Sequence, residues 1–278
     1  MMVNSTEVNP ESATHEREVA FHNRWASSTR LEDVLVRESF EAPTALENQF
    51  ILSRIGPLAG KSLLDIGSGL GESSVYFALQ GARVTIVDIS PEMIDTARKL
   101  GQRFGVELHG IVSGAEDLKL QSETYDLIYV ANTIHHIENR AMLFEQMSKA
   151  LKPGGKFFSY DPLAYNPLIN IYRRMATAVR TPDESPLTVA DLKLARKYFG
   201  NVQHREFWIS TLALFVKYYL LDGVHPDQER YWKRILHETP KSLWWWKPLG
   251  YLDKLLTRIP LVRWLAWNMV MSGEKPRS

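Results

Sequence analysis

The stretch LLDIGSGLGESS, residues 63–74, decides how the rest of this sequence is interpreted. An apolar segment leads directly into a turn with glycines at positions 67, 69 and 71. Glycine adopts backbone conformations that other residues avoid, and its lack of a side chain lets a ligand approach the main chain closely. Because ligands of open parallel sheets bind beyond the carboxyl ends of the strands, this turn is the natural place for a binding site.

The hundred residues around this turn alternate short apolar runs with helix-like segments. We expect strands at 62–67, 83–89, 106–112, 125–133 and 155–162, with helices at 71–81, 90–105 and 139–151. The last of these helices is expected to stop at the sequence KPGG, residues 152–155. This alternation with short connections predicts an α/β fold whose parallel sheet is covered by helices on both faces.

Composition narrows the functional classes. The chain has 278 residues, a formal net charge of +1 and no cysteine, which excludes disulfides, thiolate zinc sites and cysteine nucleophiles. The near-zero charge provides no field that would attract nucleic acid. The polar residues 1–14 predict a disordered tail without a signal peptide, and no apolar run is long enough to cross a membrane, so we expect a cytoplasmic protein.

The turn does not match the common nucleotide-binding patterns. A dinucleotide fingerprint needs the spacing G-x-G-x-x-G, but here the third glycine comes one residue early and Glu72 follows it. Asp65 and Glu72 would repel a pyrophosphate, and no Gly-Lys-Ser/Thr follows to form a P-loop. Asp88 ends the next strand, 21 residues after Gly67, where a carboxylate can accept both ribose hydroxyls. The pattern therefore favours adenosine joined to a cationic group.

A family resemblance is carried by five segments that follow one another in this order: LLDIGSGLGESS, ARVTIVDISPEMIDTAR, SGAEDL (residues 113–118), YDLIYVANTIHHI and LKPGGKFF. The sequence resembles the class I S-adenosylmethionine-dependent methyltransferases, in particular the bacterial small-molecule group related to the ubiquinone and menaquinone C-methyltransferases. The resemblance implies a Rossmann-like, seven-stranded, mostly parallel sheet and S-adenosyl-L-methionine as the cofactor. It is specific over 60–162 and weak over 163–278.

The resemblance also implies roles for single residues. The methionine part of the cofactor would lie on Asp65, Gly67, Ser68 and Gly69, the ribose on Asp88, and the adenine on Ile89. The adenine-edge motif departs from the family pattern, because Gly114 replaces the usual acid, so Ala115 and Glu116 would read the adenine amino group. Asn132 would lie beside the reacting methyl group.

Simpler interpretations of these residues remain open. Gly71 could serve only the packing of helix against strand, Asp88 could be an ordinary acid at a strand end, and Glu116 could be solvated.

Candidate acid–base residues follow the fourth and fifth strands. His135 and His136 could accept a proton from the acceptor, and Asp161 could orient a histidine. Tyr165 and its neighbour Tyr160 are further candidates for contacting substrate. Because adjacent side chains in a turn point in different directions, we expect at most one histidine to be catalytic, and both could be structural. We expect no metal, since the histidines have no third partner at ligand spacing.

The regions outside the core predict a lid and a cap. Residues 15–59 are expected to form a helical lid, with Trp25 and His22 on one helix face, where Trp25 would contact the cofactor or only anchor the helix. Residues 163–265 are expected to form a helical, aromatic cap containing a core strand near 202–210, and residues 266–278 a last strand and tail.

The cap region is unusually aromatic. Seven of the eight tryptophans lie beyond residue 207, and residues 241–264 combine tryptophan with lysine and arginine around one acid, Asp253. This mixture is typical of a pocket cap or dimer contact, which we favour, or of a helix lying on a membrane surface. An aromatic lining would suit an apolar or aromatic acceptor.

Three functions are compatible with these patterns. We favour methyl transfer by direct displacement to a small, apolar or aromatic acceptor. The alternatives are a non-catalytic S-adenosylmethionine-binding module and a membrane-associated methyltransferase of a lipid-like substrate, peripheral to the inner membrane face. A nucleic-acid partner is disfavoured, because the fourth strand ends in ANTIHH and no basic patch is present. The acceptor, the methylated atom and the oligomeric state stay open.

Overall fold

A seven-stranded sheet forms the centre of the computed structural model, which describes residues 10–181 and 184–277. The strands are β1 (Ser62–Ile66), β2 (Arg83–Asp88), β3 (Leu108–Val112), β4 (Tyr125–Ala131), β5 (Leu151–Pro162), β6 (Gly200–Phe207) and β7 (Asn268–Glu274). Their order is β3-β2-β1-β4-β5-β7-β6, and only β7 runs antiparallel to its neighbours. The predicted seven-stranded, mostly parallel sheet is confirmed.

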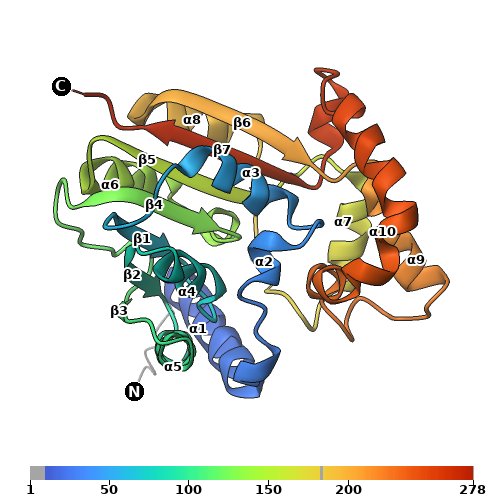
Figure 1. Cartoon of the computed structure of the whole chain (residues 1–278), viewed down its shortest axis with the longest axis horizontal. Helices are drawn as coiled ribbons and strands as arrows, with labels where there is room; N and C mark the ends of the chain where they lie inside the picture. The colour runs from blue at the N-terminus through green and yellow to red at the C-terminus, as the bar shows by residue number, and fades with distance from the viewer. Residues whose placement is uncertain (1–9, 182–183, 278) are drawn as a thin grey trace, which may run out of the picture.

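Helices cover both faces of the sheet, as its alternating buried side chains require (Figure 1). On one face lie α2 (Glu38–Glu41), α3 (Leu46–Ile55), α4 (Glu72–Leu79) and α5 (Pro91–Arg103), whose apolar side chains share a cluster with Leu63 of β1. The other face is covered by α6 (Arg140–Ala150) and α8 (Val189–Tyr198), whose apolar side chains share a second cluster with Leu64 and Ile66.

Local signals set the ends of these helices, with one exception. Ser90 caps α5, because its hydroxyl accepts a hydrogen bond from Met93 N at 3.0 Å, and Pro91 occupies the first helical turn. The KPGG segment was expected to lie between helix and strand, but β5 begins at Leu151 and includes it. The strand accommodates these residues through an irregular register with β4 between Tyr125 and Leu127.

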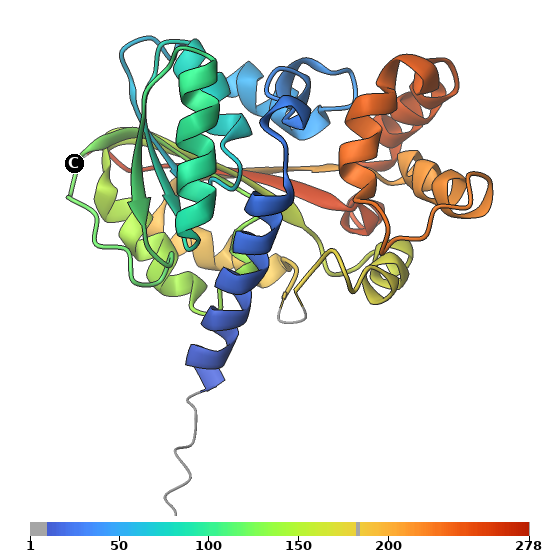
Figure 2. The ribbon, with the colours of Figure 1, turned by 90° about the horizontal axis from the view of Figure 1, so that it is seen from below.

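The N-terminal segment begins with α1 (Pro10–Ser28), which packs against α5. Residues 10–14 are therefore helical, contrary to the predicted tail, and residues 1–9 lie outside the described residues. Figure 2 shows α1 extending along α5 and past the edge of the core. A short 3-10 helix, η1 (Leu31–Asp33), follows it before α2.

The C-terminal helices form a second layer with its own core. They are α7 (Pro167–Met175), α9 (Ala213–Leu220) and α10 (Tyr231–Leu256), and Figures 1 and 2 show them gathered beyond the carboxyl ends of the parallel strands. Trp208, Phe215, Tyr218, Tyr231 and Trp246 are buried together there. We call this unit the cap, and it includes the short helices η3 (Ser210–Leu212) and η4 (Val262–Leu265).

A buried carboxylate joins two parts of the cap. Asp253 of α10 accepts hydrogen bonds from the backbone amides of Ile209 and Ser210, at 3.0 and 2.6 Å, and from the Thr211 hydroxyl at 2.5 Å. The one acid of the 241–264 segment is thus a structural residue, because it satisfies the amides that begin η3.

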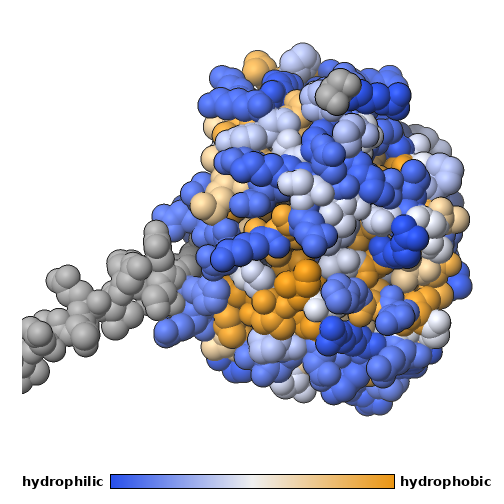
Figure 3. Space-filling model, turned by 90° about the vertical axis from the view of Figure 1, so that its left-hand side faces the viewer, coloured by the Kyte–Doolittle hydropathy of each residue, from blue (hydrophilic) through white to orange (hydrophobic). Residues whose placement is uncertain are grey.

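None of the described helices is both long and apolar enough to span a bilayer. On the side of the molecule opposite the cap, hydrophilic residues surround a central area of apolar ones (Figure 3).

Candidate active site

One cavity of about 1010 Å³ opens at the carboxyl ends of β1, β2, β4 and β5. It extends from the glycine turn at residues 67–69, under α1, to the cap residues Trp208, Trp232 and Trp267. Ligand pockets usually measure about 300–1,000 Å³, so this one has space for two small molecules side by side.

The glycine turn presents its backbone to this cavity. Gly67 (φ +71°) has no space for a side chain, because a Cβ atom would lie 2.1 Å from Thr133 Oγ1. A Cβ on Gly69 (φ +53°) would meet nothing within 4 Å, so this position faces open space. A Cβ on Gly71 would lie 2.6 Å from the Ala97 Cβ of α5, which supports the packing interpretation of this glycine. The buried Ser68 hydroxyl lines the cavity and has no hydrogen-bond partner among the described residues.

Two buried carboxylates flank the turn. Asp88 accepts hydrogen bonds from Gly69 N at 2.9 Å and Ser90 N at 3.0 Å, and burial raises its pKa despite these bonds. Asp65 accepts a hydrogen bond from Ser74 Oγ at 2.5 Å. Burial raises the pKa of Asp65 to about 7, and the nearby Asp88 and Glu72 add to the effect. A positively charged ligand would favour the ionised form of both acids.

The residues assigned to adenine and to the methyl group also line the cavity: Ile89, Ala115, Glu116 and Asn132. Glu116 is not simply solvated, because its Oε1 accepts a hydrogen bond at 2.6 Å from the backbone amide of Asn139, just before α6. Asn132 has φ +50°, a conformation that non-glycine residues adopt mainly at turns and functional sites. These contacts leave the assigned ligand roles as predictions.

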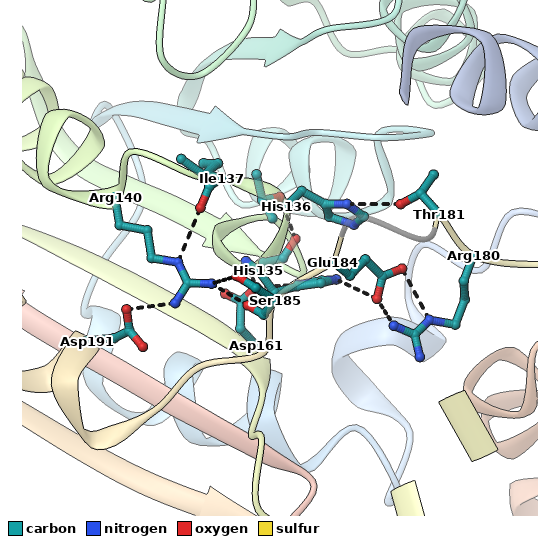
Figure 4. A network of polar contacts seen from close by, with 12 residues as sticks. His135, His136, Ile137, Arg140, Asp161, Arg180, Thr181, Glu184, Ser185 and Asp191 are labelled. Atoms are coloured by element: carbon teal, nitrogen blue, oxygen red, sulfur yellow. Dashed lines mark hydrogen bonds and ion pairs between the residues drawn. The ribbon is translucent and has the colours of Figure 1, made fainter. Parts of the chain in front are cut away.

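His135 and Asp161 form a buried pair, and His135 lines the cavity on the side where Glu184 lies (Figure 4). His135 Nδ1 lies 2.7 Å from Asp161 Oδ1, which also accepts the backbone amide of His135 at 3.2 Å. Burial raises the pKa of Asp161 to about 8 and lowers that of His135 well below its usual value, with His136 and Arg173 adding to the second shift. Both groups are thus held near neutral form at pH 7. Asp161 thus lies within hydrogen-bond distance of a histidine, and its orienting role stays a prediction.

The two histidines do not diverge as expected. Their ring centroids lie 4.2 Å apart at an interplanar angle of 40°, and both rings line the cavity. They differ in their partners, because His136 Nδ1 lies 3.2 Å from Glu18 Oε1 of α1. Burial opposes ionisation of Glu18, but its hydrogen bonds to His136 and His22 outweigh burial and hold its pKa well below the usual range.

Contrary to the sequence-based argument against a metal, the fold supplies a third ligand-type residue. One ligand atom each from His135, His136 and Glu184 lies within 4.8 Å of the others. Glu184 comes from a loop about fifty residues away, so sequence spacing could not reveal it. However, Glu184 is already paired with Arg180 and with Arg173 (3.2 Å), and these guanidinium groups oppose a cation at this position.

Tyr165, predicted to contact substrate, is not among the residues lining the cavity. It is 40% exposed, its hydroxyl accepts a hydrogen bond from Val189 N, and its ring packs on Trp264. The residue lies in the segment between β5 and α7, and residues on either side of it, Pro162 and Ile169, do line the cavity. Its neighbour Tyr160, on the strand itself, does line the cavity.

Trp25 of α1 lies at the contact between lid and cap. Its side chain lines the cavity, and the Arg230 guanidinium lies 4.1 Å from its ring centroid. This contact supports both the lid and the anchor interpretation, because the same ring faces the cavity and joins α1 to the start of α10.

Several cavity residues could not be predicted from the sequence. These are Glu18, Glu47, Asn48, Tyr129, Tyr172, Arg173, Arg180, Glu184, Arg230 and Asn268. They come from helices, strands and loops far apart in the chain, without a motif that would join them.

Comparison with known proteins agrees with this geometry. Residues 64–159 match the family model described as a methyltransferase domain. Ubiquinone biosynthesis O-methyltransferase of Xylella fastidiosa is 35% identical over 108 residues, which cover 38% of this chain and 44% of the relative. The enzyme of that name from Photobacterium profundum is 32% identical over 114 residues, 41% of this chain and 48% of the relative. The matches thus span less than half the length of these relatives.

Solved structures extend the likeness to nearly the whole chain. Phosphoethanolamine N-methyltransferase 2 of Haemonchus contortus, in complex with phosphomonomethylethanolamine and S-adenosylhomocysteine, superposes with a TM-score of 0.60 at 20% identity, covering 93% of this chain and 60% of that one. Geranyl diphosphate C-methyltransferase of Streptomyces coelicolor, in complex with Mg²⁺, geranyl diphosphate and S-adenosylhomocysteine, gives a TM-score of 0.59 at 13% identity, covering 97% and 99%.

The chain therefore contains a class I S-adenosylmethionine-dependent methyltransferase domain, as its motifs predict. Within this class, the curated relatives named above are O-methyltransferases of ubiquinone biosynthesis, whereas the motifs resembled the related C-methyltransferases.

Proposed function

We propose that this protein is an S-adenosylmethionine-dependent methyltransferase that acts on a small acceptor with an apolar or aromatic body. The observation that carries the proposal is the cavity itself, in which the glycine turn and Asp88 occupy one half and aromatic cap residues the other. The domain match and the fold of the structural relatives support it.

The residues at the turn fit the cofactor. The open space at Gly69 and the unpartnered Ser68 hydroxyl are features that a bound ligand would use. Asp88 would accept the ribose hydroxyls, Ile89 would pack on the adenine, and Ala115 with Glu116 would bind its amino group. Asp65, Gly67, Ser68 and Gly69 would hold the methionine part, and Asn132 would border the methyl group. Trp25 would close over the cofactor from α1.

When bound, the cofactor supplies an activated methyl group on a sulfonium, so the protein mainly aligns the acceptor and excludes water. Where the acceptor atom carries a proton, neutral His135 would accept it, while Asp161 fixes the orientation of the ring. The tryptophans 208, 232 and 267 would bury the apolar part of the acceptor.

Calorimetry of the full chain with S-adenosylmethionine, S-adenosylhomocysteine and NAD tests the cofactor half of the proposal. We expect the first two to bind and NAD not to bind, and the reverse result would contradict the assignment. Transfer of labelled methyl groups to small molecules of a cell extract tests the reaction. Cofactor binding without any labelled product would favour the alternative, a non-catalytic binding module.

A second proposal concerns location: the protein is cytoplasmic and contacts the inner membrane face through its cap. Among the described residues, eleven of the fifteen large apolar side chains that are strongly exposed lie between residues 216 and 265. Leu221, Trp244 and Leu261 are each at least 80% exposed. Lys247 and Lys254 of α10 would favour anionic lipid.

Co-sedimentation with phosphatidylcholine–phosphatidylglycerol vesicles tests this contact. We expect the protein to sediment with the vesicles and the double variant Trp244→Ser, Leu261→Ser to stay in the supernatant. The control variant Val112→Ser, Met142→Ser removes two exposed apolar side chains outside the cap and should behave like the original protein. Equal sedimentation of all three would contradict the proposal, and concentration-dependent self-association would then favour a dimer contact.

A further inference from the structure

Three arginines converge on the acceptor half of the cavity. Arg173 belongs to α7, Arg180 to the loop that follows it, and Arg230 immediately precedes α10. The side chains of Arg173 and Arg180 are only 12% and 18% exposed. Burial lowers the pKa of both to about 10, so they remain charged at neutral pH.

The carboxylates of this corner do not balance its positive charge. Glu184 is shared by two guanidinium groups: Arg180 Nε lies 3.2 Å from its Oε1, and Arg173 Nη2 lies 3.2 Å from its Oε2. Glu18 approaches from α1 but is bound by His136 and His22. Asp227 accepts the backbone amide of Ala178 at 2.7 Å at the outer edge. In the described part of the chain, the carboxylate that faces the arginines from inside the cavity is therefore Glu184, and it is already paired.

Two of the arginines keep donors without a partner. Arg173 Nη1 is buried and makes no hydrogen bond to any described residue. Arg230 makes no ion pair within the described chain, and its guanidinium lies over the rings of Trp25 (4.1 Å) and Phe21 (5.9 Å). A buried charged donor without an acceptor costs stability, so an arrangement that keeps one in a cavity points to a ligand that supplies the acceptor.

The forked guanidinium group matches one type of ligand. Its paired N–H groups fit the oxygens of a carboxylate or a phosphate, and a planar guanidinium loses less freedom on binding than a lysine side chain does. The neighbouring His135, His136 and Glu184 do not offer a competing cation site, because Arg173 and Arg180 occupy Glu184. The electrostatic character of the corner therefore favours an anion.

The surroundings of the arginines define the rest of the ligand. Ile169, Tyr172 and Trp232 line the cavity beside them, and the Tyr172 ring packs against Tyr231 at a centroid distance of 5.1 Å. The rest of a ligand whose oxyanion is bound at the arginines would therefore lie against these apolar side chains. The glycine turn lies at the other end of the same cavity.

We propose that Arg173, Arg180 and Arg230 form a subsite for an oxyanion, a phosphate ester or a carboxylate, on the methyl acceptor. The inference rests on the proposed function, because it assigns this half of the cavity to the acceptor. The acceptor thus carries an anionic head at the arginines and an apolar body against the aromatic wall.

Matched amphiphiles test the subsite in the full-length protein. Octyl phosphate, octanoate and octanol share one apolar chain and differ in the head group, and calorimetry measures their binding with and without S-adenosylhomocysteine. We expect at least one anion to bind ten times or more as tightly as octanol, and the stronger of the two identifies the head group. Chelation by EDTA should leave this affinity unchanged. Equal binding of all three, or loss of anion binding in EDTA, would overturn the proposal.

Variants separate this subsite from general charge effects. Arg173→Gln and Arg230→Gln should each weaken anion binding tenfold or more and leave octanol binding unchanged. Arg174→Gln, on the exposed side of α7, removes the same charge outside the cavity and should have no effect. An equal effect of Arg174→Gln would overturn the proposal. Arg230 has no ion pair to lose among the residues that the structure describes, so its variant remains informative if Arg173→Gln fails to fold.

S-adenosylhomocysteine binding distinguishes the two proposals. If all variants retain it while Arg173→Gln and Arg230→Gln lose the anion, both stand. If the original protein binds the anion but not S-adenosylhomocysteine, the methyltransferase proposal fails and the anion subsite remains.

Discussion

The two halves of the cavity are built by different means. The turn half consists of backbone and short side chains from residues 65–72 and 88–89, which are close in sequence and sit at the ends of adjacent strands. The acceptor half consists of long side chains from α7, the loop after it and the start of α10. A site made of backbone is fixed by the fold, whereas a site made of side chains can change with single residues, so the first half defines the class and the second defines the acceptor.

The largest expected effect lies in the acceptor half. His135→Gln should lower turnover by about 100- to 10,000-fold, the usual contribution of a general base, with little change in S-adenosylhomocysteine affinity. Steady-state kinetics and calorimetry measure the two quantities. His204→Gln changes a histidine that pairs with Glu206 away from the cavity and is the control. Unchanged turnover in His135→Gln would remove this residue from the mechanism.

In the turn half, the substitution Gly67→Ala should weaken cofactor binding. Its Cβ would lie 2.1 Å from Thr133 Oγ1, and the left-handed conformation adds about 1–2 kcal/mol of strain, so cofactor affinity should fall by at least tenfold. Gly105→Ala is a matched control, because Gly105 has the same φ of +71° but nothing within 4 Å of the added atom. If both variants bind S-adenosylhomocysteine equally well, close packing at Gly67 does not shape the site.

A substitution in the cap tests whether the two halves of the cavity bind their ligands independently. Asp253→Ala leaves the amides of Ile209 and Ser210 and the Thr211 hydroxyl without their acceptor, which should cost about 1–3 kcal/mol or more. Thermal unfolding should show the loss, and calorimetry should show cofactor binding retained while acceptor binding weakens. Equal loss of both ligands would mean that the halves form one cooperative unit.

The smallest effect is a pH dependence in the turn half. Burial raises the pKa of Asp65 to about 7, so in the free protein this carboxyl is half protonated at neutral pH. A cationic ligand favours the ionised form, so the affinity for S-adenosylmethionine should rise with pH up to and through about 7 and level off above it, by at most tenfold per pH unit.

S-adenosylhomocysteine and the variant Asp65→Asn are the controls for this pH dependence of affinity. S-adenosylhomocysteine lacks the sulfonium charge and should show a shallower rise, and Asp65→Asn should flatten both curves. A steep rise that persists in Asp65→Asn would assign the proton to Asp88 or Glu72, the acids that act on Asp65. Without ligand, the raised pKa means that stability falls as the pH rises from the ordinary aspartate range through about 7.

Much of the fold and of the turn half could be read from the sequence. The glycines, Asp65 and Asp88 were predictable because backbone conformation and strand ends leave local patterns, and the helix starting at Ser90 follows from its own cap. The KPGG segment was expected to separate a helix from a strand but belongs to β5, because glycine and proline also occur inside an irregular strand. Tyr165 was expected to contact substrate but does not line the cavity, because a position just past a strand end does not reveal which way its side chain points.

The sequence by itself determined the class of fold, the position of the turn and the acids beside it, since short-range patterns encode strands, helices and tight turns. Only the tertiary structure decided that His135 pairs with Asp161, that Glu184 joins the histidines, and that Arg173, Arg180 and Arg230 converge on one corner. These contacts depend on how the cap packs over the sheet, and side chains brought together from distant segments leave no periodic trace in the chain.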